Sequence, residues 1–275
     1  MHRTLAVWLA LIPCLATASE DDAFLPAAAG HLQIGRYSPT EDDLHWAGWV
    51  GAELSLLRLY ETTLAGGGQI ETVMGDTRRA FDATQVNYHL GLRMSRPVGA
   101  YTLDLFFHHV SRHEVDREKV PAVDWNVLGV RAARRFRRGA QDVRVELGLG
   151  HTTLASLINY GWEATVRAEA NLLRHGVATL YLNLDVRAVS AEAKADFPRD
   201  GFVDSLIEGG LRWSGDHRWV ETFLAFERRN DVFLQVPGVR SRLLYGLRLD
   251  FSSGGWRRPW LSRAGQACRS CGAPR

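Results

Sequence analysis

The chain has 275 residues, and 33 lysine and arginine residues against 31 aspartate and glutamate residues give a formal net charge of +2 at pH 7. This near neutrality argues against a nucleic-acid partner, because binding to a phosphate backbone needs a strongly basic surface. Beyond the N-terminal segment, no apolar run approaches the length of a membrane-spanning helix.

Residues 1–18 predict a secretory signal peptide. Arg3 provides the charged start, AVWLALIPCLA the apolar centre, and Ala16–Thr17–Ala18 a small-residue cleavage site. The apolar run is too short to cross a bilayer as a helix. We therefore expect the protein to be exported and cleaved.

The rest of the chain alternates between apolar and polar side chains in one segment after another. Even positions from Val86 to Met94 are apolar, and odd positions from Gln85 to Ser95 are polar, charged or glycine. This period of two indicates β-strands that expose one apolar face. In a soluble sandwich that face would be the core, whereas in a membrane barrel it would contact lipid and the polar set would fill the interior.

The lengths of the connections distinguish these architectures. Short turns alternate with long polar segments, as periplasmic turns alternate with extracellular loops in outer-membrane barrels. The predicted short turns are 95–99, 137–140, 174–176 and 214–217, and the long segments are 76–82, 112–123, 191–201 and 229–239. The sequence therefore predicts an all-β fold, a transmembrane antiparallel β-barrel of the bacterial outer membrane.

This rule predicts twelve strands, an even number that returns the chain to the periplasm. The first three segments are the least regular, and a barrel of ten strands is the alternative. The predicted strands are 31–38, 46–61, 67–75, 83–95, 100–111, 124–136, 141–151, 160–173, 177–190, 202–214, 218–229 and 240–251.

The last predicted strand, LLYGLRLDF, ends on Phe251 and resembles the barrel-assembly signal of outer-membrane proteins. That resemblance implies the barrel-assembly machinery as a partner during insertion. The barrel domain then covers 19–251, and residues 252–275 form a flexible periplasmic tail. The tail contains Cys268 and Cys271, a lone C-x-x-C with no nearby histidine, which argues against a zinc site.

Polar residues interrupt the apolar face of two adjacent predicted strands. The outward set that begins at Tyr101 continues, at the same period of two, into His109 and Ser111, and Asn126 is in phase with the outward Leu128. A tilted strand climbs about 2.5 Å of membrane per residue, so Ser111 lies about 25 Å above Tyr101, at the outer interface where lipid ester bonds lie.

These residue types match the requirements of nucleophilic catalysis. A serine nucleophile needs a general base, and the base needs an orienting partner for its second nitrogen. Ser111, His109 and Asn126 could fill those roles, with a symmetric hairpin placing Asn126 opposite Ser111. Alternatively, His109, Ser111 and His113 are ordinary polar residues at the level of the lipid headgroups.

The motifs His109–Val110–Ser111 and Trp125–Asn126–Val127–Leu128 resemble those of outer-membrane phospholipase A, a twelve-stranded barrel with a lipid-facing Ser-His-Asn triad. The resemblance covers about twenty residues. It implies hydrolysis of acyl esters in membrane lipids, calcium that assists the oxyanion, and a homodimer.

The loop between the two motifs departs from that family. It is three residues longer, and Arg112–His113–Glu114 replaces the family's Asn-Gly-Arg, so the family's calcium ligands cannot be carried over. Glu114, Asp116 and Glu118 are weak candidates for metal ligands, since hard cations bind carboxylate oxygens.

Three alternatives remain open. Lipid A deacylase also carries His-x-Ser outside a barrel with a carboxylate as orienting group; the nearest carboxylate here, Asp124, is predicted to point into the lumen. The stretch from His109 to His113 also resembles an H-x-S-x-H element of an uncharacterised bacterial outer-membrane family. A non-enzymatic barrel is the third, because the interior set of paired arginines and acids suits either a closed scaffold or a narrow pore.

Overall fold

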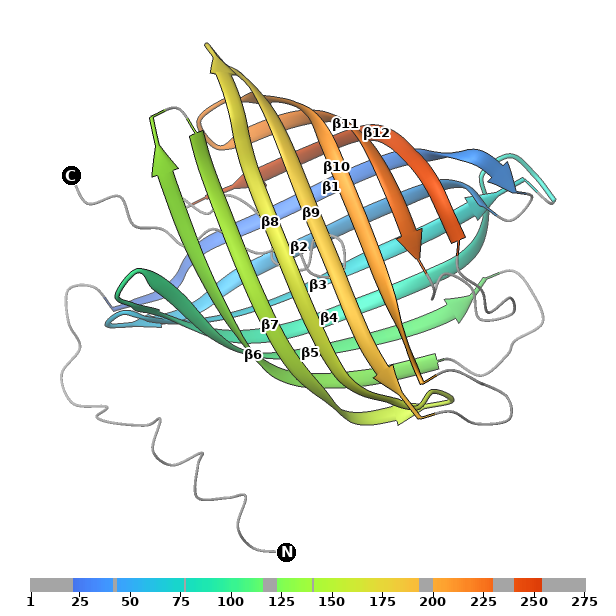
Figure 1. The fold of residues 1–275 in the computed structure, drawn as a ribbon, viewed down its shortest axis with the longest axis horizontal. Helices are drawn as coiled ribbons and strands as arrows, with labels where there is room; N and C mark the ends of the chain where they lie inside the picture. The colour runs from blue at the N-terminus through green and yellow to red at the C-terminus, as the bar shows by residue number, and fades with distance from the viewer. Residues whose placement is uncertain are drawn as a thin grey trace, which may run out of the picture.

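Twelve antiparallel strands form one closed barrel in the computed structural model (Figure 1). The structure describes residues 22–41, 44–76, 78–115, 123–139, 141–192, 200–229 and 240–253. The predicted signal peptide and nearly all of the predicted tail lie outside these residues. The strands are β1 (Ala23–Glu41), β2 (Leu44–Leu59), β3 (Thr62–Gly75), β4 (Asp82–Val98), β5 (Tyr101–Glu114), β6 (Val123–Arg138), β7 (Gln141–Ser156), β8 (Tyr160–His175), β9 (Ala178–Ala191), β10 (Gly201–Ser214), β11 (Arg218–Arg229) and β12 (Arg240–Ser252).

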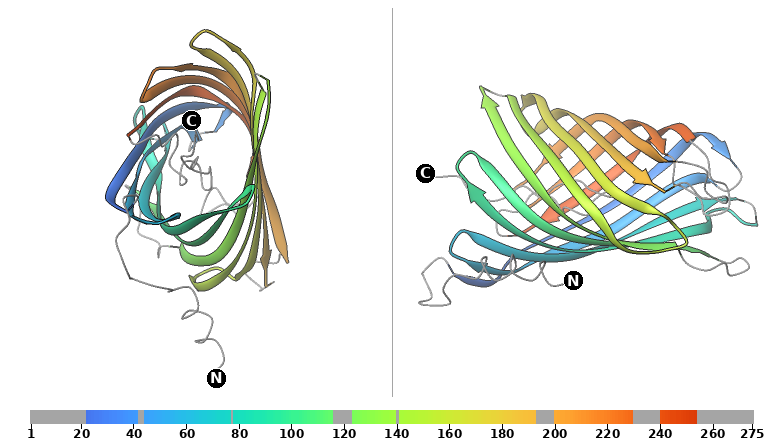
Figure 2. Two further views of the ribbon diagram at one scale, coloured as in Figure 1. Left: turned by 90° about the vertical axis from the view of Figure 1, so that its left-hand side faces the viewer. Right: turned by 60° about the horizontal axis from the view of Figure 1, so that its bottom comes forward.

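Each strand pairs with its neighbours in the sequence, and β1 closes the barrel by pairing with β12. The closing register runs from Ala29 opposite Ser252 to Ser38 opposite Leu243. Figure 2 shows the tilted strands wrapping around a single axis. Closure leaves the sheet with no unpaired edge, which a lipid environment requires because it offers no hydrogen-bonding partners. The predicted fold class and the predicted count of twelve strands are confirmed.

The largest difference from the predicted bounds is in the first strand, and β3 also starts earlier than predicted. β1 begins at Ala23 rather than at residue 31, and β3 includes residues 62–66, which the sequence pattern left out. Glycines obscure the period of two in β3 because they have no side chain to show which face they take. Gly67 is required by a close approach, since a Cβ there would lie 2.7 Å from the carbonyl oxygen of Ala52.

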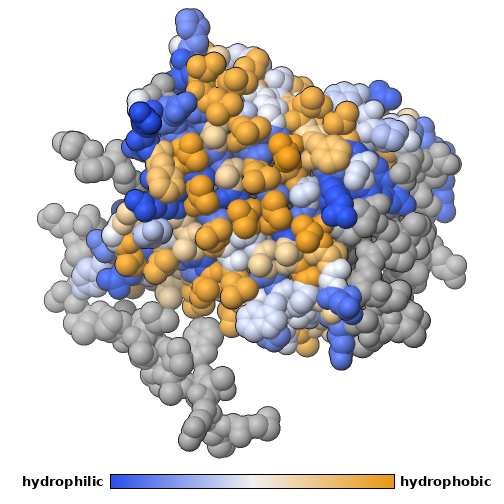
Figure 3. Space-filling view, in the orientation of Figure 1, coloured by the Kyte–Doolittle hydropathy of each residue, from blue (hydrophilic) through white to orange (hydrophobic). Residues whose placement is uncertain are grey.

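The exterior of the barrel is apolar and the interior is polar. Figure 3 shows an apolar band across the strands between hydrophilic ends. Trp162 and Trp213 are exposed near opposite ends of the barrel, as expected for interfacial aromatic residues. Of the residues predicted to face lipid, Leu105 is partly exposed and the rest are exposed: Leu103, Leu147, Val166, Leu182 and Leu249.

This distribution is the reverse of that in a soluble domain and is typical of transmembrane barrels of the bacterial outer membrane. The buried polar residues include arginines and glutamates from most of the strands. None of the described residues forms a helix long and apolar enough to cross a membrane.

Cysteine labelling is expected to report the two faces directly. Leu182 is 43% exposed and the adjacent Asn183 is 5% exposed. In a background with Cys268 and Cys271 changed to serine, Leu182→Cys in proteoliposomes should react with a lipid-restricted maleimide and Asn183→Cys should not. Reaction of Leu182→Cys with a membrane-impermeant reagent, at the rate of an exposed loop cysteine, would contradict the membrane-facing surface.

Candidate functional site

Strands β5 and β6 place His109 and Asn126 directly opposite each other on the outer surface of the barrel. The His109 Nδ1 and Asn126 Oδ1 atoms are 2.7 Å apart. Because an amide oxygen only accepts hydrogen bonds, Nδ1 carries the proton of this bond. The Nε2 atom of a neutral His109 is then left as the basic nitrogen. The structure therefore brings together two members of the predicted triad.

The register between these strands differs from the predicted one by two residues. Ser111 lies opposite Asp124, and not opposite Asn126. A period of two specifies which face a side chain takes, and a shift of two residues leaves every face unchanged. The alternation of apolar and polar residues therefore predicts that Ser111 and Asn126 share a face. It does not specify the register between their two strands.

Ser111 makes its hydrogen bond within its own strand. Its Oγ atom lies 2.7 Å from Nε2 of His113, two residues further along β5 and on the same face. The ring of Tyr88, whose residue is opposite Ser111 on β4, packs edge-on against the His113 ring at 5.4 Å between centroids. His113 was not among the predicted site residues, although its spacing from Ser111 is the signal that identifies it.

Asp124 also lies on the outer surface, so its predicted orientation into the lumen is wrong. It is two residues from Asn126 on β6 and opposite Ser111, and both relations put it on the same face. The hydroxyl of Ser156 on β7 donates a hydrogen bond of 2.7 Å to its carboxylate. The outer surface thus carries a carboxylate beside the candidate nucleophile.

Exposed leucines border this polar group on both sides. Leu90 on β4 lies opposite His109, and Leu154 on β7 lies opposite Asn126. Both leucine side chains are exposed on the barrel exterior. The polar group is therefore surrounded by apolar side chains on the membrane-facing surface.

Of the candidate metal ligands, the described residues include Glu114, and it does not lie beside Ser111. Glu114 has the parity of Arg112 on β5 and therefore faces the interior, on the opposite side of the barrel wall. Asp116 and Glu118 lie outside the described residues. No group of three or more histidine, cysteine, aspartate or glutamate side chains within the described ranges is arranged to hold a metal ion.

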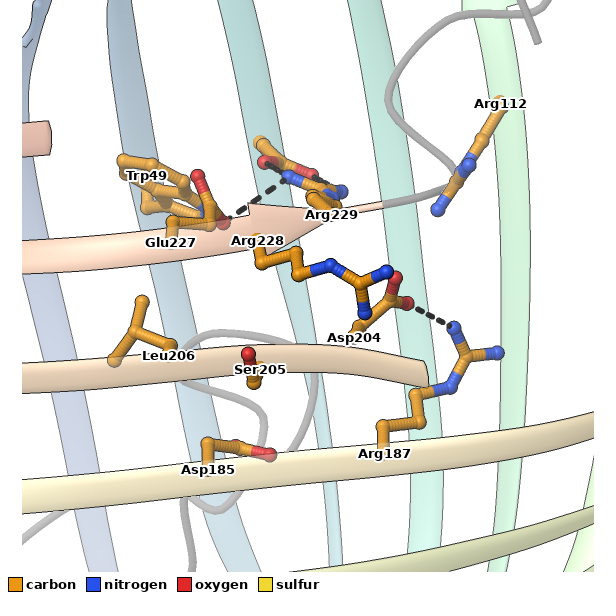
Figure 4. Close-up of a pocket in the computed structure, with 11 residues that line it drawn as sticks. Trp49, Arg112, Asp185, Arg187, Asp204, Ser205, Leu206, Glu227, Arg228 and Arg229 are labelled. Atoms are coloured by element: carbon orange, nitrogen blue, oxygen red, sulfur yellow. Dashed lines mark hydrogen bonds and ion pairs between the residues drawn. The ribbon is translucent and has the colours of Figure 1, made fainter. Parts of the chain in front are cut away.

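The interior contains a separate cavity that is partly open to solvent (Figure 4). Arg112 lines it, while its neighbours Ser111 and His113 point outward, so the barrel wall separates the cavity from the outer polar group. The lining residues are Trp49, Glu71, Arg112, Asp185, Arg187, Asp204, Ser205, Leu206, Glu227, Arg228 and Arg229. The lining residues include four arginines and four carboxylates, so they carry no excess of either charge.

Ion pairs cross this interior. Arg229 on β11 lies 2.6 Å from Glu71 on β3, a contact that spans the lumen. Elsewhere, Glu146 is within 3.2 Å of three arginines: Arg131, Arg144 and Arg167. These contacts place paired charged side chains inside the lumen.

Planar-bilayer recordings are expected to show no steady conductance, because buried ion pairs connect strands inside the lumen. Arg167→Ala should also be silent, since Arg131 and Arg144 still contact Glu146. A steady current in the wild-type protein that changes in Arg167→Ala would contradict a closed interior and would support the pore.

No family model and no curated protein matches the chain. Among solved structures it is similar to outer membrane phospholipase A from Escherichia coli, with a TM-score of 0.50 and 11% identity over 81% of this chain and 95% of that one. The outer membrane phospholipase dimer of Salmonella typhi with bound calcium gives a TM-score of 0.48 and 12% identity over 81% and 90% of the two chains. OmpT, an outer membrane protein of Vibrio cholerae, gives 0.42 and 9% identity over 87% and 100%. The first of these likenesses supports the fold described above, that of an outer-membrane β-barrel.

Proposed function

We propose that this protein is an outer-membrane hydrolase of lipid acyl esters, with Ser111 as nucleophile, His109 as base and Asn126 as the orienting residue. The main support for the proposal is the 2.7 Å contact between His109 Nδ1 and Asn126 Oδ1. His109 is two residues from Ser111 along β5, and both side chains lie on the membrane-facing surface. Polar side chains are costly on the lipid-facing side of a barrel, and a linked histidine and amide beside a serine suit catalysis.

The reaction follows from these roles. The Ser111 Oγ atom attacks the carbonyl carbon of an ester while its proton passes to a histidine nitrogen. The ester C–O bond breaks, and the leaving alkoxide takes that proton and departs as the alcohol. Water, deprotonated in turn by histidine, then attacks the acyl-serine, and Oγ regains a proton as a fatty acid is released.

The position of the site selects lipids as the substrate class. The predicted depth of Ser111, at the outer interface, is the level of lipid ester bonds, and Leu90 and Leu154 offer apolar contacts for an acyl chain. Phospholipids and lipid A both carry such esters in the outer membrane. Because Asp124 lies opposite Ser111, it could provide the orienting carboxylate of the lipid A deacylase-like alternative.

We propose that a second copy of the barrel restricts access to the site, because a site facing the bilayer otherwise has permanent contact with its substrate.

Covalent labelling tests the proposal. The purified barrel in detergent, with and without calcium, is treated with a sulfonyl-fluoride lipid analogue and then analysed by peptide mass spectrometry. Modification confined to Ser111, together with fatty-acid release from phospholipid or lipid A vesicles, is the expected result. A folded barrel that neither reacts at Ser111 nor releases fatty acid in either condition would rule out the hydrolase.

A non-enzymatic scaffold is the second candidate, and the buried ion pairs of the interior favour it over a pore. Under this reading the outer polar group contacts lipid headgroups only. Ser111→Ala would then leave the protein's lipid interactions unchanged, and no acyl product would form in the assay above.

A further inference from the structure

The hydrogen bond of Ser111 connects it to a histidine outside the predicted triad. The Oγ atom of Ser111 lies 2.7 Å from His113 Nε2, the distance expected when a hydroxyl donates to an imidazole nitrogen. A base that removes a proton from a nucleophile must be within this reach. His113 meets the requirement in the arrangement that the structure shows.

The two flanking histidines are held differently. His109 is tied through Nδ1 to Asn126 on the neighbouring strand. His113 has its ring packed edge-on against Tyr88, on the other neighbouring strand. Ser111 lies between them on one face of β5, so two imidazoles supported from opposite sides border one hydroxyl.

We propose that His113 is a second catalytic histidine, the base that deprotonates Ser111 when the acyl-enzyme forms. This inference rests on the proposed hydrolase activity and assigns its two half-reactions to different histidines. The Ser111 proton moves to His113 Nε2 as the bond from Oγ to the acyl carbon forms, and His113 returns that proton to the leaving alkoxide as the ester C–O bond breaks. His109 Nε2, left basic by the bond to Asn126, then takes a proton from the attacking water and delivers it to Oγ as the acyl-serine bond breaks.

If His113 has only a structural role, a different result is expected for the reactivity of Ser111. In that case its bond to Ser111 satisfies two polar groups at the membrane surface, and its loss would alter stability without changing the reactivity of the serine. The rate of covalent modification of Ser111 separates the two readings, because it reports acylation chemistry alone.

The experiment compares His113→Ala, His113→Gln and His109→Ala in the full-length protein, each checked for folding by circular dichroism. His151→Ala is the matched control, since His151 is an exposed histidine on the exterior of β7 that contacts the carbonyl of Gly161. The readouts are the rate constant of Ser111 labelling by the sulfonyl-fluoride lipid analogue and the turnover of a radiolabelled phospholipid.

Removing His113 is expected to slow labelling by about 10²–10⁴-fold, and added imidazole should partly restore the rate to His113→Ala. His109→Ala should label within tenfold of the wild-type rate yet fail to turn over, so that acyl-enzyme accumulates. His151→Ala should match the wild type. His113→Gln serves as the test if the alanine variant does not fold.

The inference is overturned if both His113 variants label at the wild-type rate while Ser111→Ala is inactive; the proposed hydrolase then survives with His109 as its base. Loss of labelling in His109→Ala alone overturns it in the same way. If the His113 variants and His109→Ala all lose labelling, His113 is supported as a base, but the assignment of the two half-reactions to different histidines is overturned. A wild-type protein that is never labelled at Ser111 refutes the hydrolase itself.

Discussion

Replacing Ser111 by alanine is expected to lower fatty-acid release by roughly 10⁴-fold or more, because the nucleophile of the covalent step is lost. His109→Ala should cost roughly 10²–10⁴-fold in turnover, the usual contribution of a general base. Asn126→Ala should cost less than His109→Ala, since an amide orients the imidazole but stabilises the imidazolium less than a carboxylate does. Initial rates on phospholipid and lipid A vesicles measure all three.

The ranking of the three variants matters more than any single loss. The matched control is again His151→Ala, an exterior histidine on β7, two strands from β5, whose rate should equal that of the wild type. Retention of full activity by Ser111→Ala would contradict the proposed nucleophile. Equal losses in all variants, the control included, would point to misfolding rather than to chemistry.

The second large effect concerns stability. Arg248 on β12 lies 2.8 Å from Glu208, 2.5 Å from Glu221 and 2.7 Å from the amide oxygen of Gln33. Arg248 is 2% exposed, and both glutamates are 0% exposed. Arg248→Met should lower the free energy of unfolding by about 3–5 kcal/mol, because it leaves two carboxylates buried without this guanidinium.

Urea unfolding in phospholipid vesicles, followed by tryptophan fluorescence, measures this loss. Arg96→Met is the matched control, because Arg96 is exposed on β4 and its replacement should change stability by about 0.5 kcal/mol or less. The double variant Arg248→Met with Glu221→Gln should recover part of the loss, since one buried charge is then removed. A loss below about 1 kcal/mol in Arg248→Met would show that water or neighbouring groups compensate for the missing guanidinium.

Strand number and strand faces could be predicted from the sequence because the side-chain period of a strand is two and lipid selects one face. The outward leucines at 103, 147, 182 and 249 follow from this rule alone. The rule fails where glycines replace side chains, as at residues 66–68 of β3, whose start it misplaced.

The candidate site could be predicted only in part. The shared face of His109, Ser111 and Asn126 follows from their parity, and the structure confirms that shared face. Parity also puts His113 and Asp124 on that face, so both could have been included from the sequence alone. The roles of Ser111, His109 and Asn126 stay a prediction that the kinetic experiments test.

Alternation and connection lengths in the sequence predicted a barrel of twelve strands, with ten as the alternative, and with an apolar exterior, a charged interior and a group of polar residues near one end of its lipid-facing surface. The register between β5 and β6 came from the folded barrel, and with it the contacts of His109 with Asn126 and of Ser111 with His113. The folded barrel also decided which interior charges pair, including the contact of Arg229 with Glu71 across the lumen. The reason is physical: alternation along a strand specifies a face and is unchanged by a shift of two residues, whereas register and cross-lumen pairing depend on all twelve strands closing together.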